Sequence, residues 1–272
     1  MKNIRPPAVA GYFYSANAKD LRKEVENFLR DIPLHPGVEH ICGIISPHAG
    51  YTYSGKTAAY GYAQLKGKNY STVVVIAPSH REYFPGLSVY DGDAYETPLG
   101  IVEVDKEKAA LIQQSSSSFF FGKSGHKGEH SLEVQIPFLQ VVLGEFKIVP
   151  IVVGDQSEGF LNELADGLDK IFDDRTLFVA SSDLSHFHSS EKADILDSRV
   201  EEAITNFDFR QLLKNSEDGK IEACGAGPVI SLMKGLAGKG VNKSAVLHRC
   251  NSGDVSGDHS EVVGYLSAIL YR

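Results

Sequence analysis

The sequence predicts a single three-layer α/β domain in which helices cover both faces of a central, mostly parallel or mixed sheet. Two observations carry this prediction. Hydrophobic runs typical of buried strands alternate along the chain with segments whose apolar residues recur at helical spacing. The 272 residues, 42% of them hydrophobic, are also enough to bury one large core. Because no stretch is typical of an interdomain linker, we expect one domain over residues 1–272.

The expected elements follow one another in a regular order. Helices are expected over residues 20–29, 54–65, 131–139, 161–172 and 228–236. Strand-like runs cover residues 41–48, 72–80, 87–90, 100–104, 146–154, 176–182, 244–249 and 262–270. The runs over 87–90 and 100–104 alternate in polarity, so we expect them to be antiparallel additions to the sheet. Pro137 should kink its helix or lie in an early turn, and residues 115–125 stay unassigned.

Composition and charge exclude several classes of function. The formal net charge of −8 and the lack of a basic run disfavour nucleic-acid binding, which relies on clustered Lys and Arg. No apolar run approaches the length of a membrane span, and the first residues lack the apolar core of a signal peptide. Three cysteines, an odd number, argue against a disulfide framework. We therefore expect a cytoplasmic protein that binds neither nucleic acid nor membrane.

Polar side chains follow several hydrophobic strands at the point where each strand ends. His48 and His80 each come directly after such a run, and Asp183 and His186 follow a third. Because ligands gather outside the carboxyl ends of strands in an open α/β sheet, we expect these side chains to converge. His130 stands at the start of a predicted helix and is a further candidate. A single histidine in such a place is more often a hydrogen-bonded surface residue, but its repetition indicates a site.

Cys224 adds a sulfur ligand to this set. It precedes the helix expected over residues 228–236, where unsatisfied N–H groups favour a thiolate. The alternative is that Cys224 is a small buried apolar side chain, the common fate of a free cysteine. Imidazole, carboxylate and thiolate groups together are sufficient to hold a transition metal. The other histidines, among them His126, are expected at the surface or behind the ligands.

Several motifs in this order resemble the Memo family, and the resemblance extends over essentially the whole chain. The motifs are Pro47-His48-Ala49-Gly50-Tyr51-x-Tyr53-Ser54-Gly55, Ala77-Pro78-Ser79-His80, Glu129-His130-Ser131-x-Glu133-x-Gln135-x-Pro137, Ser181-Ser182-Asp183-Leu184-Ser185-His186 and Cys224-Gly225. Microbial members of that family are known as protein B of the AmmeMemoRadiSam system, which implies an AMMECR1-like protein and a radical-SAM protein as partners. The family's fold is similar to that of class III extradiol, or LigB-type, dioxygenases, which cleave catechol rings with non-haem iron.

The resemblance also implies roles for individual residues. His48, His80 and Cys224 match the metal-binding set of the family. The catalytic candidates match polar residues of the same cleft: His130, Asp183 and His186. LigB-type enzymes complete two histidines with a carboxylate, whereas this chain offers a cysteine. Because thiolate is softer than carboxylate, ring-cleaving activity does not carry over with the fold.

Three hypotheses of function follow. The leading one is metal-dependent redox chemistry on an unknown small molecule, with iron or copper favoured as the metal and zinc as the further option. The second is a non-catalytic module that binds a peptide or protein in a groove lined by aromatic residues, namely Tyr12, Phe13, Tyr14, Tyr51 and Tyr53. The third is a zinc hydrolase in which His48 and His80 hold the metal and Asp183 acts as base, although no HExxH spacing accompanies it.

Overall fold

The computed structural model describes residues 2–272 and confirms the alternation of strands and helices. The strands are β1 (Ile4–Arg5), β2 (Ile41–Ser46), β3 (Thr72–Pro78), β4 (Leu87–Tyr90), β5 (Ala94–Thr97), β6 (Gly100–Glu103), β7 (Phe119–Gly122), β8 (Lys147–Val153), β9 (Thr176–Ser181), β10 (His186–His188), β11 (Lys243–Asn251) and β12 (Val262–Tyr271). The helices are α1 (Ala18–Leu29), α2 (Tyr51–Ala63), α3 (Lys106–Gln113), α4 (His130–Glu133), α5 (Ile136–Leu143), α6 (Glu158–Ile171), α7 (Ser190–Thr205), α8 (Phe209–Glu217), α9 (Ala226–Ala237) and α10 (Gly253–Ser256).

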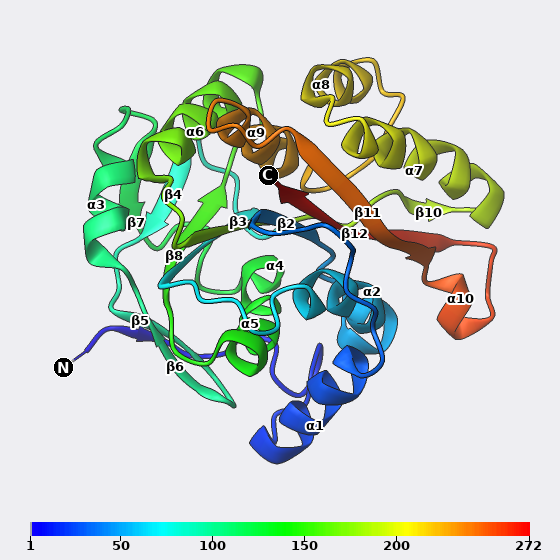
Figure 1. Cartoon of the computed structure of the whole chain (residues 1–272), viewed down its shortest axis with the longest axis horizontal. Helices are drawn as coiled ribbons and strands as arrows, with labels where there is room; N and C mark the ends of the chain where they lie inside the picture. Colours follow the sequence, from blue (N-terminus) through cyan, green and yellow to red (C-terminus); the bar gives the residue numbers. More distant parts are fainter. Residues whose placement is uncertain (1) are drawn as a thin grey trace.

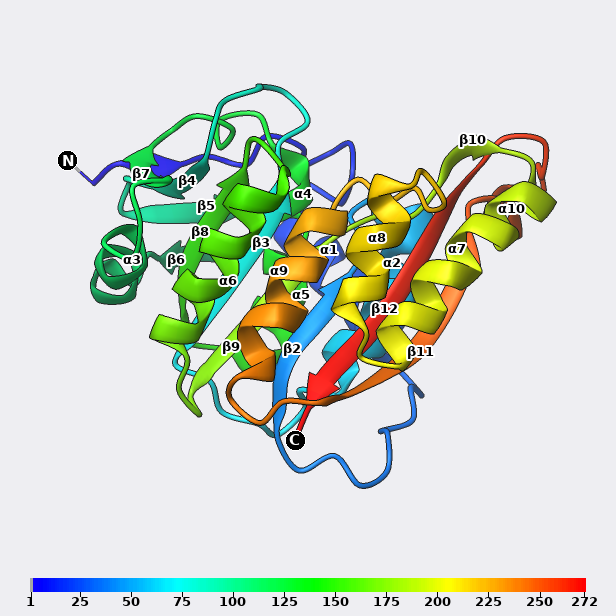
Figure 2. The same ribbon diagram turned by 90° about the horizontal axis from the view of Figure 1, so that it is seen from above.

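A large mixed sheet forms the middle layer. Its strand order is β10-β12-β2-β9-β3-β8-β4-β7, and β11 pairs with β12. The central strands β2, β9, β3 and β8 are mutually parallel, whereas β12 runs antiparallel to β2 and β4 runs antiparallel to β8. Figures 1 and 2 show α6, α7, α8 and α9 on one face of this sheet and α1, α2, α4 and α5 on the other. The predicted three-layer α/β architecture is therefore confirmed.

The order of the central strands positions the site. Strand β9 lies between β2 and β3, with Ser46 of β2 opposite Ser181 of β9 and Ile76 of β3 opposite Ala180 of β9. Every residue of these three strands is buried, as expected for parallel strands covered by helices on both faces. The carboxyl ends of β2, β9 and β3 are consequently adjacent, and the loops that follow them lie side by side.

The two strands predicted over residues 87–90 and 100–104 belong to different sheets. Strand β4 is an antiparallel addition to the large sheet, as predicted, and pairs with β8. Strand β6 pairs with β5 in a separate three-stranded sheet of order β1-β5-β6. The sequence did not indicate β5, because the turn-rich residues 91–93 separate the runs over 87–90 and 100–104 and are typical of a direct connection between two neighbouring strands. Strand β7 lies within residues 115–125, which had no assignment.

The helices also differ from the prediction in several places. Residues 131–139 contain the end of α4 and the start of α5, with Pro137 in the first turn of α5, where a missing N–H costs no helical hydrogen bond. Helices α3, α7, α8 and α10 were not predicted. Helices α3, α8 and α10 have 8, 9 and 4 residues, so each offers few turns in which an apolar period can be recognised. Helix α7 is longer, but only six of its 16 residues are buried, Asp197 among them, which weakens its apolar period.

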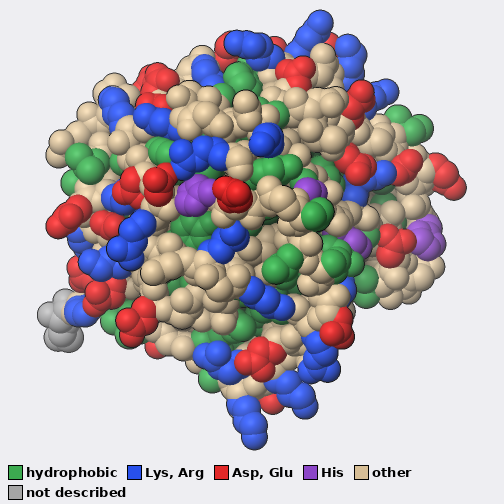
Figure 3. All heavy atoms as spheres, in the orientation of Figure 1, with side chains coloured by type: hydrophobic (Ala, Val, Ile, Leu, Met, Phe, Trp, Pro, Cys, Tyr) green, Lys and Arg blue, Asp and Glu red, His purple; other side chains and the backbone are tan. Residues whose placement is uncertain are grey.

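The molecular surface carries no single dominant charge on the face shown in Figure 3. Lysine and arginine side chains are interspersed there with aspartate and glutamate. Among residues 2–272, no helix has both the length and the apolar character that a membrane span needs.

A buried carboxylate ties the first residues of the chain to the core. Glu133, at the end of α4, is fully buried and pairs with the Arg5 guanidinium. The same carboxylate accepts hydrogen bonds from the Ala8 N–H at 2.8 Å, the Val9 N–H at 3.1 Å and the Tyr14 hydroxyl at 2.6 Å. Because all of these donors point at one buried charge, the segment before α1 is fixed against the helix that carries His130.

Replacing Glu133 by alanine should strongly destabilise the protein. The change leaves the Arg5 charge buried without its partner, which costs about 3–5 kcal/mol of unfolding free energy. Urea denaturation measures the loss. The matched control is Glu103→Ala, which breaks the exposed Lys2–Glu103 pair and should leave the urea midpoint unchanged within error. Equal effects of the two substitutions would contradict this account of Glu133.

Candidate metal centre

His48 lies just beyond β2 and is held through both its backbone and its ring. Its N–H donates to Oδ1 of Asp183 at 2.7 Å, and its Nδ1 lies 2.8 Å from Oγ of Ser181. The Ser181 hydroxyl donates its only hydrogen to the Ser131 carbonyl at 2.7 Å, because a carbonyl can only accept. Ser181 therefore accepts the Nδ1–H of His48, and the lone pair of this imidazole is on Nε2.

Gln135 holds Ser181 in this orientation. Its Nε2 donates to Oγ of Ser181 at 2.9 Å and to the Pro47 carbonyl at 3.0 Å. Its Oε1 accepts from the Tyr62 hydroxyl at 2.7 Å, which fixes the side of the amide that carries the oxygen. The tautomer of His48 is thus determined by a buried network that reaches to helix α2.

His80 lies just beyond β3 and is held by Glu129, a carboxylate only 1% exposed. Oε2 of Glu129 accepts from the backbone N–H of His80 at 2.6 Å, and Oε1 lies 2.9 Å from its Nδ1. An ionised carboxylate can only accept, so Nδ1 carries the hydrogen and Nε2 carries the lone pair. The His80 side chain is 29% exposed, so the site opens to solvent on its side.

Cys224 lies in the loop before α9, and its side chain contacts His48. Its Sγ lies 3.2 Å from Nε2 of His48 and accepts from the backbone N–H of Asp183 at 3.3 Å. The next residue, Gly225, presses against the end of β9. A Cβ at Gly225 would lie 2.1 Å from the Ser181 carbonyl oxygen, so only glycine allows this close approach.

Two groups of ligand atoms result from this arrangement. In the first, atoms of His48, His80 and Cys224 all lie within 4.8 Å of one another. The structure therefore brings together the three residues predicted as metal ligands. The second group has the same spacing and consists of His80, Glu129 and His130. Two histidines and a carboxylate are the ligands of the facial triad in non-haem iron enzymes.

The hydrogen bonds of Glu129 distinguish the two groups. Besides its two bonds to His80, this carboxylate accepts from the N–H of His130 at 3.1 Å, the N–H of Ser131 at 3.0 Å and the Ser131 hydroxyl at 2.8 Å. A metal ion on Glu129 would displace buried donors and leave them unpaired, which is costly. The Cys224 sulfur, by contrast, accepts only one hydrogen bond from the backbone, from the N–H of Asp183. The group that contains Cys224 is thus the better metal site.

The three predicted catalytic residues lie at different depths around this group. The His130 ring is centred 5.5 Å from that of His48 and 4.8 Å from that of His80. Oδ2 of Asp183 lies 3.9 Å from Nε2 of His48. His186 lies on the short strand β10, is partly exposed and belongs to neither ligand group. The structure thus brings His130 and Asp183 to the ligands, whereas His186 is part of neither ligand group.

Burial governs the protonation of these groups. It lowers the pKa of His48 well below the usual value and that of His130 to about 4, so both imidazoles are neutral at pH 7. It raises the pKa of Asp183 to about 7 and lowers the pKa of His186. Burial also acts to raise the pKa of Glu129, but hydrogen bonds from His80 and from the backbone outweigh it and give about 2.

The prediction that Cys224 is a thiolate is wrong for the protein without a bound metal ion. Cys224 does stand directly before Gly225, the N-cap of α9, as the sequence indicated. Burial, reinforced by the charge of Asp183, nevertheless raises the pKa of the thiol. The helix N-terminus is too weak to offset this burial. A metal ion would have to displace the thiol proton when it binds.

His126 is also not a surface residue. It is fully buried, its Nδ1 accepts from the Tyr95 hydroxyl at 2.7 Å, and its Nε2–H donates to the Ser88 carbonyl at 3.1 Å. Its backbone carbonyl accepts from Nε of Arg5 at 2.7 Å. His126 therefore stabilises the fold next to the N-terminal segment.

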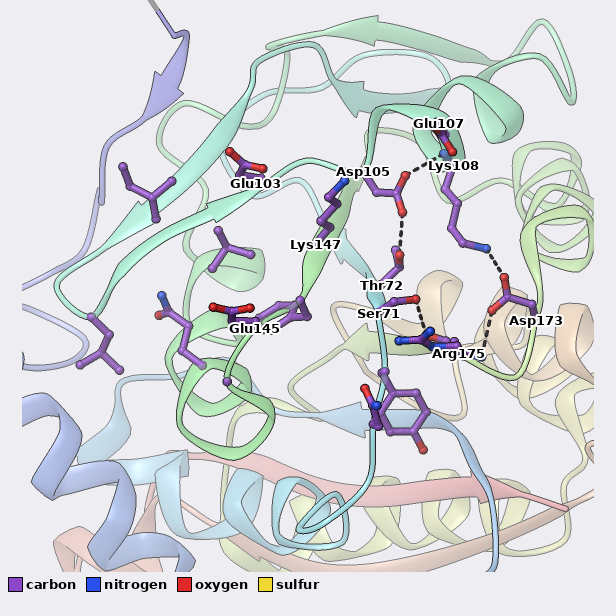
Figure 4. A pocket seen from close by; sticks show the side chains of 18 of the residues that line it. Ser71, Thr72, Glu103, Asp105, Glu107, Lys108, Glu145, Lys147, Asp173 and Arg175 are labelled. Atoms are coloured by element: carbon purple, nitrogen blue, oxygen red, sulfur yellow. Dashed lines mark hydrogen bonds and ion pairs between the residues drawn. The ribbon is translucent and has the colours of Figure 1, made fainter.

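A wide groove of about 1190 Å³ lies at the opposite end of the sheet. Thr72 and Lys147, the first residues of β3 and β8, line it (Figure 4). Asp105 accepts a hydrogen bond from the Thr72 hydroxyl at 2.6 Å, and Lys108 pairs with Asp173 at 2.7 Å. Some of its charged groups are thus paired, and the groove contains none of the predicted site residues.

Comparison with known proteins gives the family. A sequence profile described as Memo-like protein matches residues 5–269. The chain belongs to the Memo family. It is 39% identical to a MEMO1 family protein of Methanobrevibacter smithii, over 98% of this chain and 99% of that protein. It is 36% identical to a MEMO1 family protein of Thermoplasma volcanium, over 99% of both chains. A MEMO1 family protein of Methanocaldococcus jannaschii is 35% identical, over 99% of this chain and all of its own length.

Sequence reasoning missed three residues that hold the ligands of this Memo-family site. Glu129, Gln135 and Ser181 all belong to the motifs that resemble the family, but none of them received a role. One signal was present in the sequence, because Ser181 is a polar residue at the end of an otherwise apolar strand. Their hydrogen bonds join segments far apart in the chain, so spacing along the sequence does not indicate them.

The buried His126 should make the stability of the protein sensitive to acid. Burial lowers the pKa of His126 to about 3 in the folded chain, against about 6.5 when unfolded. Between these values the unfolded chain binds a proton that the folded chain does not, so stability is lost as the pH falls from about 6.5 towards 3. His126→Gln should reduce the slope of unfolding free energy against pH by up to about 1.4 kcal/mol per unit. Urea titrations at pH 7, 6, 5 and 4 measure it, and identical slopes would refute the assignment.

Proposed function

We propose that this Memo-family protein binds a redox-active metal ion on Nε2 of His48, Nε2 of His80 and Sγ of Cys224, and that it acts on a small molecule there. The observation that carries the proposal is that His48, His80 and Cys224 each place a ligand atom within 4.8 Å of the others. Both imidazoles use Nδ1 to donate a hydrogen bond, so both offer Nε2. The site is thereby prepared for a cation before one binds.

The donor set fits a transition metal. Nitrogen and sulfur ligands lie about 2.0–2.3 Å from such an ion, which places ligand atoms roughly 3.5 Å apart. Nε2 of His48 and Sγ of Cys224 are 3.2 Å apart. Three protein ligands leave a coordination position open for a small molecule. Bound iron or copper would supply one-electron chemistry at that position.

The chain's own acids and bases would surround the substrate. His130 is centred 4.8 Å from the His80 ring, and its buried Nδ1 makes no hydrogen bond but lies 3.3 Å from Oε1 of Glu129. Asp183 has Oδ2 3.9 Å from Nε2 of His48. Both can take or give a proton beside the open position. We assign His186 to the same task from the outer part of the cleft, where it would act on a larger substrate.

The donor types favour iron or copper over zinc. Two imidazoles and a thiolate are the ligands of copper electron-transfer sites, and a thiolate also suits copper(I). Zinc accepts the same ligands, in which case Asp183 would serve as the base of a hydrolase. Selective retention of zinc by the purified protein would therefore favour hydrolysis over redox chemistry.

Peptide binding is a second candidate, favoured by exposed aromatic residues near the site. Tyr12 is 89% exposed, Phe187 73% and Tyr53 43%. Tyr14 and Tyr51, also expected in the groove, are instead buried in the core. Binding of a peptide that survives the loss of the metal ligands would support this candidate. AMMECR1-like and radical-SAM partners stay a prediction from the family resemblance.

Metal content tests the leading proposal. Untagged wild-type protein, incubated with iron, copper or zinc and then desalted, should retain one metal ion per chain by elemental analysis. Cys224→Ala and His48→Ala should each lose most of it, because either change removes a ligand. The control is Cys250→Ala, since Cys250 is a partly buried cysteine outside both ligand groups. Equal metal content in all four proteins would contradict the proposal.

A further inference from the structure

We propose that Glu129 is a positioning residue that holds His80 in the Nδ1–H tautomer and thereby raises the affinity of the site for divalent metal ions. This inference rests on the proposed function and extends it from the ligands to the residues behind them. It follows from a difference between the two imidazoles that ligand composition alone does not indicate.

The two histidines donate to acceptors of different charge. Nδ1 of His80 lies 2.9 Å from Oε1 of Glu129, a buried carboxylate. Nδ1 of His48 lies 2.8 Å from Oγ of Ser181, a neutral hydroxyl. Either acceptor fixes a tautomer, but only the carboxylate pushes electron density onto the imidazole and strengthens it as a ligand for a cation. Glu129 should therefore contribute more to metal affinity than Ser181 does.

Glu129 is well suited to hold a ring that is itself partly exposed. Its carboxylate receives the two bonds from His80 already described, the N–H groups of His130 and Ser131, and the Ser131 hydroxyl. It cannot rotate away without leaving several buried donors unpaired. The His80 side chain, 29% exposed, would otherwise be free to turn. Glu129 thus transfers the rigidity of the core to the exposed ligand.

The substitution Glu129→Gln removes this function with little change in shape. The glutamine oxygen can still accept from the backbone of His130 and Ser131, which preserves the cap of α4. That oxygen, in the place of Oε1, can still accept from Nδ1 of His80, whereas the NH₂ group in the place of Oε2 cannot accept from the His80 backbone. Because a neutral amide oxygen holds Nδ1–H more weakly than a carboxylate does, the Nδ1–H tautomer of His80 should lose its dominance.

The experiment uses full-length protein and cobalt(II) as the probe. Competition with a chelator measures Co(II) affinity, and thiolate-to-cobalt absorption reports that Cys224 is bound. The nitrogen chemical shifts of His80 in metal-free protein report its tautomer. We expect Glu129→Gln to weaken Co(II) roughly 10–100-fold and to convert His80 to a mixture of tautomers.

Asp105→Asn is the matched control. It is the same acid-to-amide change at another helix N-cap, since Oδ1 of Asp105 accepts from the Lys108 N–H at 3.1 Å. Asp105 lies at the opposite end of the sheet, so Co(II) affinity and the His80 tautomer should stay as in the wild type.

Two results would overturn the inference. One is wild-type Co(II) affinity in Glu129→Gln together with an unchanged His80 tautomer. The other is equal weakening by Glu129→Gln and Asp105→Asn, which would show a general effect of replacing a helix-capping carboxylate by an amide. If wild-type protein binds no Co(II), the proposed function and the affinity part of this inference are both wrong, while the tautomer still decides whether Glu129 positions His80.

Discussion

The position of β9 between β2 and β3 is the constraint on which the site depends. It places the loops after β2 and β3 on either side of Ser181 and Asp183. From there, Asp183 holds the backbone of His48 and binds the Cys224 loop from the other side. Because the three strands are buried on both faces, these loops rest on a rigid base. The ligand geometry is thus a property of strand order, and the side-chain hydrogen bonds refine it.

A second constraint is the need to satisfy buried polar groups. The carboxylates of Glu133 and Glu129 lie near each other in sequence at the two ends of α4, and both are fully saturated with donors. Glu133 secures the N-terminal segment, and Glu129 secures His80. The short helix α4 therefore connects the stability of the fold to the geometry of the site, which explains why a four-residue helix is placed so deep in the structure.

Most of the fold could be predicted because its central strands are continuous apolar runs that end at polar residues, as the run ending before His80 does. What could not be predicted depends on weaker or non-local signals. Helix α7 has a weak apolar period and α8 is short, and β6 has a partner in a separate sheet that no local pattern indicates. In the site, the convergence of His48, His80 and Cys224 could be predicted, because the histidines follow the ends of strands and all three residues belong to motifs that resemble the family. The roles of Ser181 and Glu129 could not, because a hydrogen bond between distant segments leaves no periodic trace in the sequence. The prediction that Cys224 is a thiolate was wrong for the protein without a metal ion. Burial, which the sequence does not reveal, raises the pKa of the thiol more than the helix dipole lowers it.

The central claim is that His48, His80 and Cys224 hold the metal and that Glu129 stays behind them. Anomalous X-ray scattering from crystals grown without chelator and soaked with the metal that the protein retains tests this directly. The account predicts one anomalous peak within bonding distance of Nε2 of His48, Nε2 of His80 and Sγ of Cys224. A peak bonded instead to the carboxylate of Glu129 and to His130 would contradict it.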